Sequence, residues 1–195
     1  MVQFTPSYFS KRSGFVINQL SGGGCEHMGN FPTFPVKGKL KMSPDNILNY
    51  RINVSEEKGH AGYYEAMVQE DIKAKLTVTE RTGMASYEYP ADQQYGTIII
   101  GGGISATPIE QAAIVITAPN KCEGYAEGGN FCGLRTPYKV YFVAEFDTDA
   151  FETGTWKREE LMPNTTFAEG EYSGVYFTFD VNKKKNIQLE FLMFQ

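Results

Sequence analysis

The chain has 195 residues, of which 42% are hydrophobic and 14% aromatic, which is enough for a sizeable core in one domain. The formal net charge of −5 at pH 7 argues against a nucleic-acid partner, because such partners select for basic patches. No apolar run approaches the roughly 18 residues of a membrane-spanning helix, so no membrane partner is expected.

The amino terminus does not resemble a signal peptide. Residues 1–4, Met-Val-Gln-Phe, provide neither a basic segment nor a long apolar segment. The chain starts abruptly in an expected strand. Two explanations stay open, a cytoplasmic protein or a fragment that lacks its upstream part.

Three cysteines are too few for a disulfide framework. Cys122 and Cys132 flank a glycine-rich segment and can pair only if their strands align, which leaves Cys25 as a free thiol. The alternative for each cysteine is a small, buried apolar residue, which is the usual environment of a free cysteine.

Short strands are predicted along the first half of the chain. The clearest pattern lies in residues 72–81, where Ile72, Ala74, Leu76 and Val78 alternate with lysine and threonine. A period of two predicts a strand with one solvent-exposed face, and residues 84–89 are expected to pair with it as a hairpin. Weaker patterns predict strands at residues 2–5, 15–20, 37–42 and 63–69, a turn at 43–46 and a polar loop at 56–62.

The second half continues in the same way. Residues 97–100, Thr-Ile-Ile-Ile, predict a central strand buried on both faces, and residues 112–117 are similar. Residues 174–179 and 187–193 are predicted to form a hairpin with the basic tip 183–185. Other expectations are a glycine-rich loop at 125–133, an alternating strand at 138–146, a short strand or irregular edge at 151–157, and one helical turn at 158–161.

About a dozen short strands separated by glycine, proline and asparagine turns predict an all-β protein built as a sandwich or a larger two-sheet assembly. No stretch of twelve residues shows a convincing helical stripe. The sequence contains no internal repeat and no low-complexity linker. We therefore expect one domain over residues 1–195.

The stretch richest in functional groups is residues 21–30, Ser-Gly-Gly-Gly-Cys-Glu-His-Met-Gly-Asn. Three successive glycines let the backbone take positive φ and approach a ligand or another segment closely. The candidate binding residues are Gly24, Cys25, Glu26, His27 and Asn30. The alternative is a tight structural corner between two strands, because glycine-rich loops are common turns.

Familiar catalytic motifs are missing from the sequence: there is no P-loop, no G-x-S-x-G and no H-E-x-x-H. Glycines 101–103 follow a strand but precede no helix, so a dinucleotide site is not expected. Cys25 and His27 do not have a useful zinc spacing. A nucleophile pair of Cys25 and His60 forms only if the fold brings the two together.

Carbohydrate chemistry has modest support from the residues alone. Glycosidases need two placed carboxyl groups, and no pair of carboxylates stands out. Aromatic side chains near loops could stack on sugar rings, although packing in the core or at its rim is the favoured role of each. These residues are Tyr63, Tyr64, Tyr125, Phe131 and Trp156.

Several segments taken in order resemble one family. Residues 20–30 contain Leu-Ser-Gly followed by Gly-Cys, and residues 59–64 read Gly-His-Ala-Gly-Tyr-Tyr. These motifs are similar to the amino-terminal domain of bacterial glycoside hydrolase family 92 proteins, which are calcium-dependent, exo-acting α-mannosidases such as α-1,2-mannosidases. Glu26 and His27 stand where the family often has Pro-Asp. Further matches lie at residues 1–6, 72–90, 124–125, 131–133, 140–146 and 154–156.

The resemblance implies a β-supersandwich of the galactose-mutarotase kind, with mainly antiparallel strands. In the family this domain packs against a carboxy-terminal helical toroid that carries the general acid, the general base and most calcium ligands. That catalytic domain is not present in residues 1–195. We therefore expect this chain alone to be inactive and not to bind calcium.

The function implied by the resemblance is the amino-terminal part of an inverting exo-α-mannosidase, whose partner is a mannose-containing glycan. Residues 22–30 would form part of the sugar pocket, with Glu26, His27 and Asn30 hydrogen-bonding sugar hydroxyls and Cys25 packed behind them. The family is often secreted or periplasmic. The alternative is a non-catalytic carbohydrate-binding or interaction domain.

Overall fold

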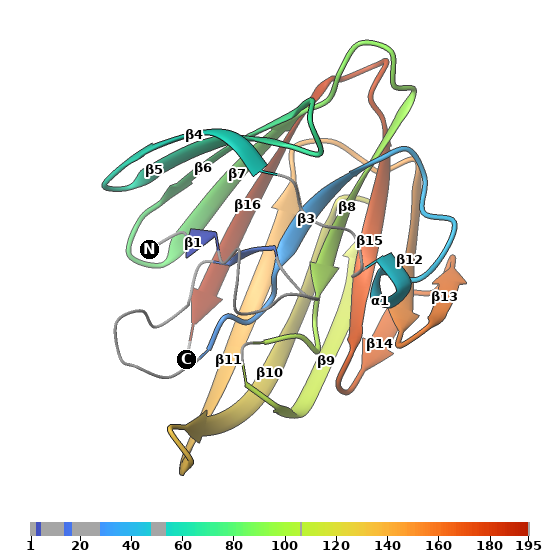
Figure 1. Cartoon of the computed structure of the whole chain (residues 1–195). Helices are drawn as coiled ribbons and strands as arrows, with labels where there is room; N and C mark the ends of the chain where they lie inside the picture. Colours follow the sequence, from blue (N-terminus) through green and yellow to red (C-terminus); the bar gives the residue numbers. More distant parts are fainter. Residues whose placement is uncertain (1–2, 5–13, 17–27, 48–53, 106, 195) are drawn as a thin grey trace.

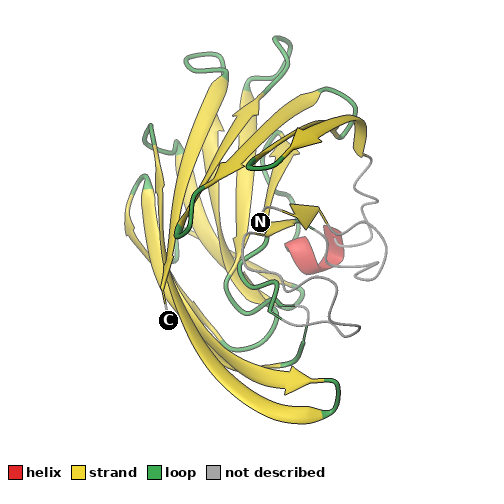
Figure 2. Cartoon of the chain, turned by 90° about the vertical axis from the view of Figure 1, so that its left-hand side faces the viewer, coloured by secondary structure: helices red, strands yellow, loops and turns green. Residues whose placement is uncertain are grey.

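Two antiparallel β-sheets face each other in the computed structural model (Figures 1 and 2), which describes residues 3–4, 14–16, 28–47, 54–105 and 107–194. The smaller sheet has the strand order β1 (Gln3–Phe4), β2 (Phe15–Val16), β3 (Thr33–Lys37), β8 (Tyr95–Gly101), β15 (Ser173–Asp180), β12 (Glu152–Lys157) and β13 (Glu160–Pro163).

The larger sheet has the order β14 (Phe167–Glu169), β9 (Ile109–Ala118), β10 (Lys121–Phe131), β11 (Leu134–Phe146), β16 (Asn186–Phe194), β7 (Thr82–Glu88), β6 (Ile72–Val78), β5 (Tyr63–Val68) and β4 (Val54–His60). The only helix among the described residues is the single turn α1 (Pro44–Ile47). The prediction of an all-β sandwich of antiparallel strands is therefore confirmed.

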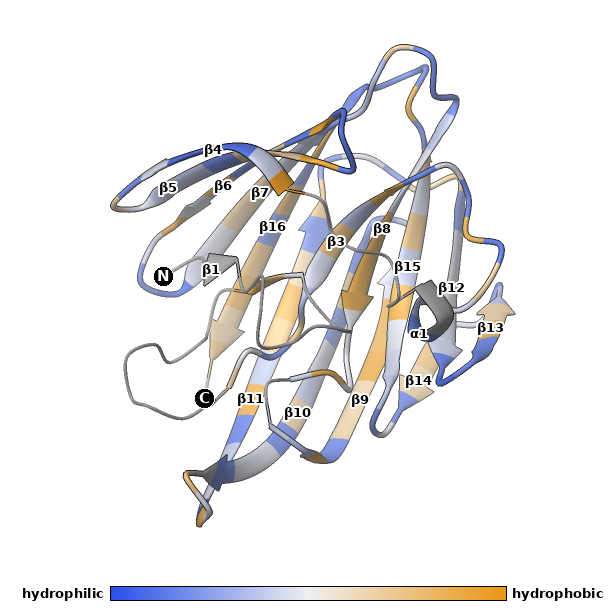
Figure 3. Ribbon diagram, in the orientation of Figure 1, coloured by the Kyte–Doolittle hydropathy of each residue, from blue (hydrophilic) through white to orange (hydrophobic). Residues whose placement is uncertain are grey.

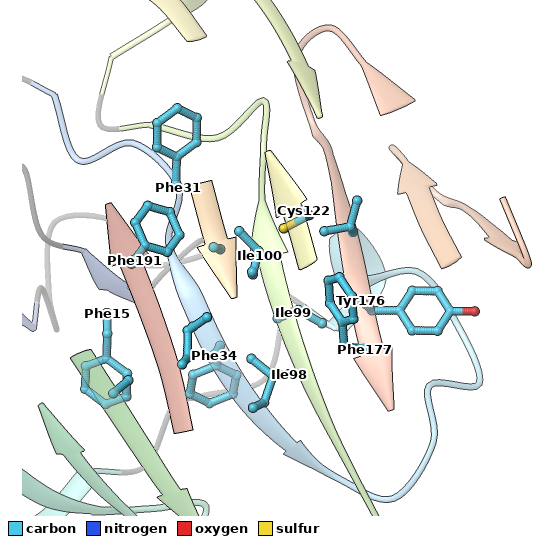
Figure 4. Close-up of a cluster of buried hydrophobic side chains, with 14 of the residues drawn as sticks. Phe15, Phe31, Phe34, Ile98, Ile99, Ile100, Cys122, Tyr176, Phe177 and Phe191 are labelled. Carbon is cyan, nitrogen blue, oxygen red and sulfur yellow. The ribbon is translucent and has the colours of Figure 1, made fainter. Parts of the chain in front are cut away.

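The core lies between the two sheets and is rich in aromatic side chains (Figure 4). Phe146 of β11 packs on Phe177 and Phe179 of β15, with ring centroids 4.8 Å and 5.0 Å apart. Edge-to-face and tilted aromatic pairs add to the stabilisation that comes from removing apolar area from water. These contacts join the sheets through residues that are more than 30 positions apart in the sequence.

The strands with alternating sequences turn their apolar side chains toward the core, as predicted. Figure 3 shows the alternation of hydrophobic and hydrophilic residues along the strands. In β6, Ile72, Ala74 and Leu76 are buried while the lysines between them are not. In β11, the buried face starts at Val140, and Tyr138 is only half-buried. The isoleucines of β8 are all buried, which confirms a central strand, whereas β9 is buried on one face only.

The predicted hairpin of residues 174–179 and 187–193 is wrong. β15 pairs with β8 and β12 in the smaller sheet, whereas β16 pairs with β11 and β7 in the larger one. The segment between them crosses from one sheet to the other. Its Lys184 forms an ion pair with Asp147 at 2.7 Å, so the basic segment is partly tied down rather than freely solvated.

Other boundaries also differ from the predictions. The strand expected at residues 37–42 lies at β3, the turn at 43–46 overlaps α1, and the polar loop at 56–62 is mostly β4. β4 is an edge strand with most of its side chains exposed, which explains its polar sequence. Residues 158–161 form no helical turn; they lie in the tight hairpin between β12 and β13, where Arg158 has a φ of 51°.

The glycine-rich segment at residues 125–133 is also mostly strand, not loop. Gly128 and Gly129 belong to β10, which pairs with β9 and β11, and only Gly133 lies in the turn that follows. A Cβ on the nearby Gly124 would lie 2.3 Å from the carbonyl oxygen of Ala113. Glycine inside a strand often marks such a close approach of two backbones, so composition alone suggested a loop where the fold needs close packing.

Cys122 and Cys132 do not form the disulfide that the sequence had left open. Cys122 is a free thiol with no solvent exposure, and Cys132 is disulfide-bonded. The two are therefore not bonded to each other. Burial raises the pKa of the Cys122 thiol well above its usual range, so Cys122 behaves as a small core residue.

Within the part of the chain that the structure describes, no helix has the length and hydrophobicity needed to cross a membrane.

Candidate functional site

The glycine-rich stretch that the sequence singled out is described at its carboxy-terminal end. Gly24, Cys25, Glu26 and His27 lie outside the described residues. Asn30 lies inside them and is completely buried. The structure therefore defines how the stretch is attached to the sandwich, through the residues on either side of positions 17–27.

Two phenylalanines attach these flanking residues to the core. Phe15, in β2, lies 6.1 Å from the ring of Tyr64 and 6.3 Å from that of Tyr87. Phe31 lies 4.3 Å from the ring of Phe142 and 6.2 Å from that of Phe191 (Figure 4). Both are 2% exposed, and they line the same small apolar cavity. The two ends of the glycine-rich stretch are thus held close to each other.

The backbone after the stretch follows an unusual path. Met28, Gly29 and Phe31 have φ values of 59°, 72° and 56°. Residues other than glycine seldom adopt positive φ, and such conformations persist only where surrounding contacts fix them. Burial of Asn30 and the packing of Phe31 provide those contacts here.

The glycine triplet at residues 101–103 packs next to the backbone that follows the glycine-rich stretch. The Gly101 amide donates a hydrogen bond to the carbonyl of Pro32, and the Gly103 amide donates to that of Ser173. A Cβ on Gly103 would lie only 1.9 Å from the carbonyl oxygen of Gly170. The triplet therefore allows these backbone segments to pack closely. This structural role agrees with the expectation that the triplet is not a dinucleotide site.

The segment that resembles Gly-Tyr-Tyr forms the turn between β4 and β5. The Tyr64 hydroxyl donates to Glu57 at 2.8 Å, while its ring faces Phe15. The fold thereby brings the second resembling segment beside Phe15, which precedes the first segment in the sequence. The exposed His60 ring stacks on Tyr63 instead, with centroids 5.3 Å apart.

A carboxyl group near this turn has the wrong electrostatics for an acid catalyst. Glu65 accepts hydrogen bonds from the Tyr63 hydroxyl at 2.7 Å and forms an ion pair with Lys73 at 3.2 Å. The hydrogen bond from Tyr63, followed by that from Lys73, lowers the pKa of Glu65. A general acid needs its pKa raised, so Glu65 is held as a carboxylate.

No group of three or more histidine, cysteine, aspartate or glutamate side chains that could hold a metal ion is found among the described residues. Calcium prefers six to eight oxygen ligands, several of them carboxylates. The described residues therefore do not offer the cluster of carboxylates that a calcium ion prefers.

The aromatic candidates for sugar stacking separate into different environments. Trp156 is 1% exposed and belongs to the core, so packing is its role. Tyr125 is half-buried on the outer face of the larger sheet, beside Tyr141, which in turn contacts Phe194. The structure describes the backbone but not the side chain of Phe131. Sequence reasoning missed Tyr141 and Phe194, because only strand register makes them neighbours of Tyr125.

Comparisons with known proteins agree with this architecture. A family GH92 inverting mannosidase from Bacteroides thetaiotaomicron superposes with a TM-score of 0.69 at 22% identity, covering 85% of this chain and 22% of its own. A family GH92 alpha-mannosidase from the same bacterium superposes with a TM-score of 0.80 at 21% identity, covering 98% of this chain and 30% of its own. A search of curated proteins finds no match.

This chain thus spans less than a third of the length of these two solved mannosidases. At such identities the superpositions establish a shared fold. A family model provides the assignment itself, since the model described as the glycosyl hydrolase family 92 N-terminal domain matches residues 6–191. The chain therefore belongs to the family of glycosyl hydrolase family 92 N-terminal domains.

Proposed function

We propose that this chain is the amino-terminal domain of a calcium-dependent exo-α-mannosidase that hydrolyses terminal α-mannosides with inversion, and that the domain is inactive alone. The proposal rests on the share of each known enzyme that this chain matches. The sandwich accounts for 85–98% of this chain but for only 22–30% of two solved family 92 mannosidases. Those enzymes therefore contain much additional chain, in which the catalytic groups can lie.

The chemistry of inversion supports this division of labour. An inverting glycosidase needs a protonated carboxyl group at the leaving oxygen and a carboxylate that activates water on the opposite face. Glu65 is held ionised by Tyr63 and Lys73, so it cannot supply the proton. A companion helical domain would supply the acid, the base and the calcium ligands.

The glycine-rich stretch would contribute one wall of the sugar pocket. Gly24 would let the backbone approach the sugar closely, and Glu26 and His27 would hydrogen-bond its hydroxyls, with Cys25 packed behind them. Asn30, which the sequence had also assigned to the sugar, has no solvent exposure and would instead fix the end of the stretch to the sandwich. The attachment of the flanking Phe15 and Phe31 to the core supports this role. A binding loop works best when a rigid scaffold presents it.

The test uses a longer protein that joins this domain to its helical companion. It should hydrolyse an aryl α-mannoside in the presence of calcium and lose that activity when calcium is chelated. Glu26→Ala should raise KM roughly 5–150-fold, because a hydrogen bond to a charged or buried partner contributes about 1–3 kcal/mol. The melting temperature should stay within about 2 °C of the parent.

A matched control is Glu80→Ala, which removes a carboxylate from an exposed turn. It should leave both KM and melting temperature unchanged. If Glu26→Ala lowers the melting temperature steeply while the folded fraction keeps its KM, the stretch is a structural corner and its proposed role in the pocket is wrong. Asn30→Ala is less informative, because Asn30 is buried and its loss would affect folding as well.

A further inference from the structure

A second concave region lies on the outer face of the larger sheet, across β14, β9, β10 and β11 to the end of β16. It is a groove of about 410 Å³. Its position follows from strand alternation: Phe142 and Ala144 point into the core, so Tyr141 and Val143 point away from it. Figure 1 shows these strands side by side.

Three aromatic side chains from neighbouring strands form one wall of this groove. Register places Tyr125 opposite Tyr141, and Tyr141 opposite Phe194. The Tyr141 and Phe194 rings lie 6.0 Å apart and nearly parallel, at 13°. Tyr125 is tilted at 47°, with its centroid 6.1 Å from that of Tyr141. Phe167 of β14 lines the groove at its other end and is 52% exposed.

A lysine holds the aromatic wall in place. The Lys139 ammonium lies 4.2 Å from the centroid of Tyr125 and 5.4 Å from that of Tyr141. The same ammonium forms an ion pair with Glu127. Cation–π contacts and the ion pair together restrict these rings, so less conformational entropy remains to be lost when a ligand binds.

The polar groups of the groove are few and well placed. Glu123 lies between Val115 and Val143 in the register of the three strands, and its side chain is exposed. Tyr125 and Tyr141 each add a hydroxyl group. A groove of this size with mainly apolar walls and a few converging polar groups is typical of a small-ligand site.

The combination favours a sugar chain over a protein partner. A pyranose presents an apolar C–H face to an aromatic ring and hydroxyl groups to carboxylates, which matches alternating tyrosines, phenylalanines and Glu123. A protein partner that covered the groove would have to provide a cation for the Glu123 carboxylate, whereas sugar hydroxyls can donate hydrogen bonds to it without a counter-charge. A concave groove also suits an extended oligosaccharide.

We propose that this groove binds a neutral oligosaccharide of pyranose rings, so that the domain holds a glycan at a site separate from the glycine-rich stretch. The choice of mannose as the sugar rests on the proposed function. The row of Tyr125, Tyr141 and Phe194 runs across the strands, so it accepts successive rings of a linear chain.

The test uses the 195-residue chain alone and linear α-linked mannotriose as the probe. Two-dimensional ¹H–¹⁵N NMR should show saturable shift changes confined to β9, β10, β11, β14 and β16, with a Kd of roughly 0.1–10 mM, since a shallow site buries little of its ligand. Tyr141→Ala should weaken binding at least tenfold, and Phe194→Ala should do the same if Tyr141→Ala fails to fold.

The control variant is Phe151→Ala, which removes a 57% exposed aromatic side chain next to β12 of the smaller sheet and should bind like the parent. No shift changes at 20 mM mannotriose, or undiminished binding by Tyr141→Ala and Phe194→Ala, would overturn the proposal. So would a dimer in sedimentation velocity that Phe194→Ala abolishes, because a second copy would then occupy the face. None of these results involves hydrolysis, so each is distinguishable from failure of the mannosidase proposal.

Discussion

Replacing Phe31 by alanine should destabilise the sandwich strongly, because this side chain attaches the segment after the glycine-rich stretch to the larger sheet. Phe31 is 2% exposed, and its ring lies 4.3 Å from that of Phe142 and 6.2 Å from that of Phe191. Truncating a buried phenylalanine costs about 3–5 kcal/mol through lost burial and the cavity that remains. A domain of this size loses roughly 2–4 °C of melting temperature per kcal/mol, so a decrease of about 6–20 °C is expected.

Thermal unfolding followed by circular dichroism measures this decrease directly. The matched control is Phe151→Ala, whose side chain is 57% exposed and contacts Tyr95 and Lys39 near the surface. It should cost less than about 1 kcal/mol and lower the melting temperature by no more than about 4 °C. Equal melting temperatures for the two variants would refute the claim that Phe31 attaches the glycine-rich stretch to the core.

Two further predictions concern buried groups. Burial raises the pKa of Tyr176 to about 12 and that of Tyr87 even higher, whereas tyrosines of the unfolded chain ionise near pH 10. The free energy of unfolding should therefore be full below about pH 10 and decrease as the pH rises toward 12. Urea unfolding at several pH values measures this, and constant stability up to pH 12 would contradict it. In alkylation followed by mass spectrometry, the Cys122 thiol should react only after the chain is unfolded, and Cys132 only after its disulfide is reduced. Labelling of Cys132 in the unfolded but unreduced chain would show that it is not in a disulfide.

The sequence was informative wherever one face of a strand meets water. Residues 72–78 and 138–146 alternate because lysines and glutamates face solvent while residues such as Leu76 and Phe142 face the core. The β-branched run of β8 was recognisable because both of its faces are covered. Local patterning of this kind reports burial, and burial decides whether a strand forms.

Sheet membership could not be predicted from the same patterns. β15 and β16 are separated by a short polar segment, which in isolation is typical of a hairpin. β15 pairs with β8 and β12, and β16 pairs with β11 and β7; of these partners only β12 is near in the sequence. Pairings at such separations leave no signal in the connecting residues.

The candidate site stays a prediction from the sequence, and its surroundings in the fold could not be predicted. Glycines and polar residues identified residues 21–30, and the resemblance identified the family, which the family model confirms. The attachment through Phe31 was not foreseen, because its partners Phe142 and Phe191 lie more than 100 residues further along the chain. The groove was missed for the same reason: Tyr125, Tyr141 and Phe194 become neighbours only through strand register.

The central claim is that this sandwich provides part of a sugar pocket but not the catalytic groups. Its most direct test is to measure release of an aryl group from an aryl α-mannoside, and of mannose from a mannan oligosaccharide, by the purified 195-residue chain with calcium present. The account predicts no turnover above the buffer blank, because it assigns the acid and base, about 6.5–9.5 Å apart in an inverting glycosidase, to the companion domain. Clear turnover that persists through repeated purification would contradict it and place the catalytic residues within this chain.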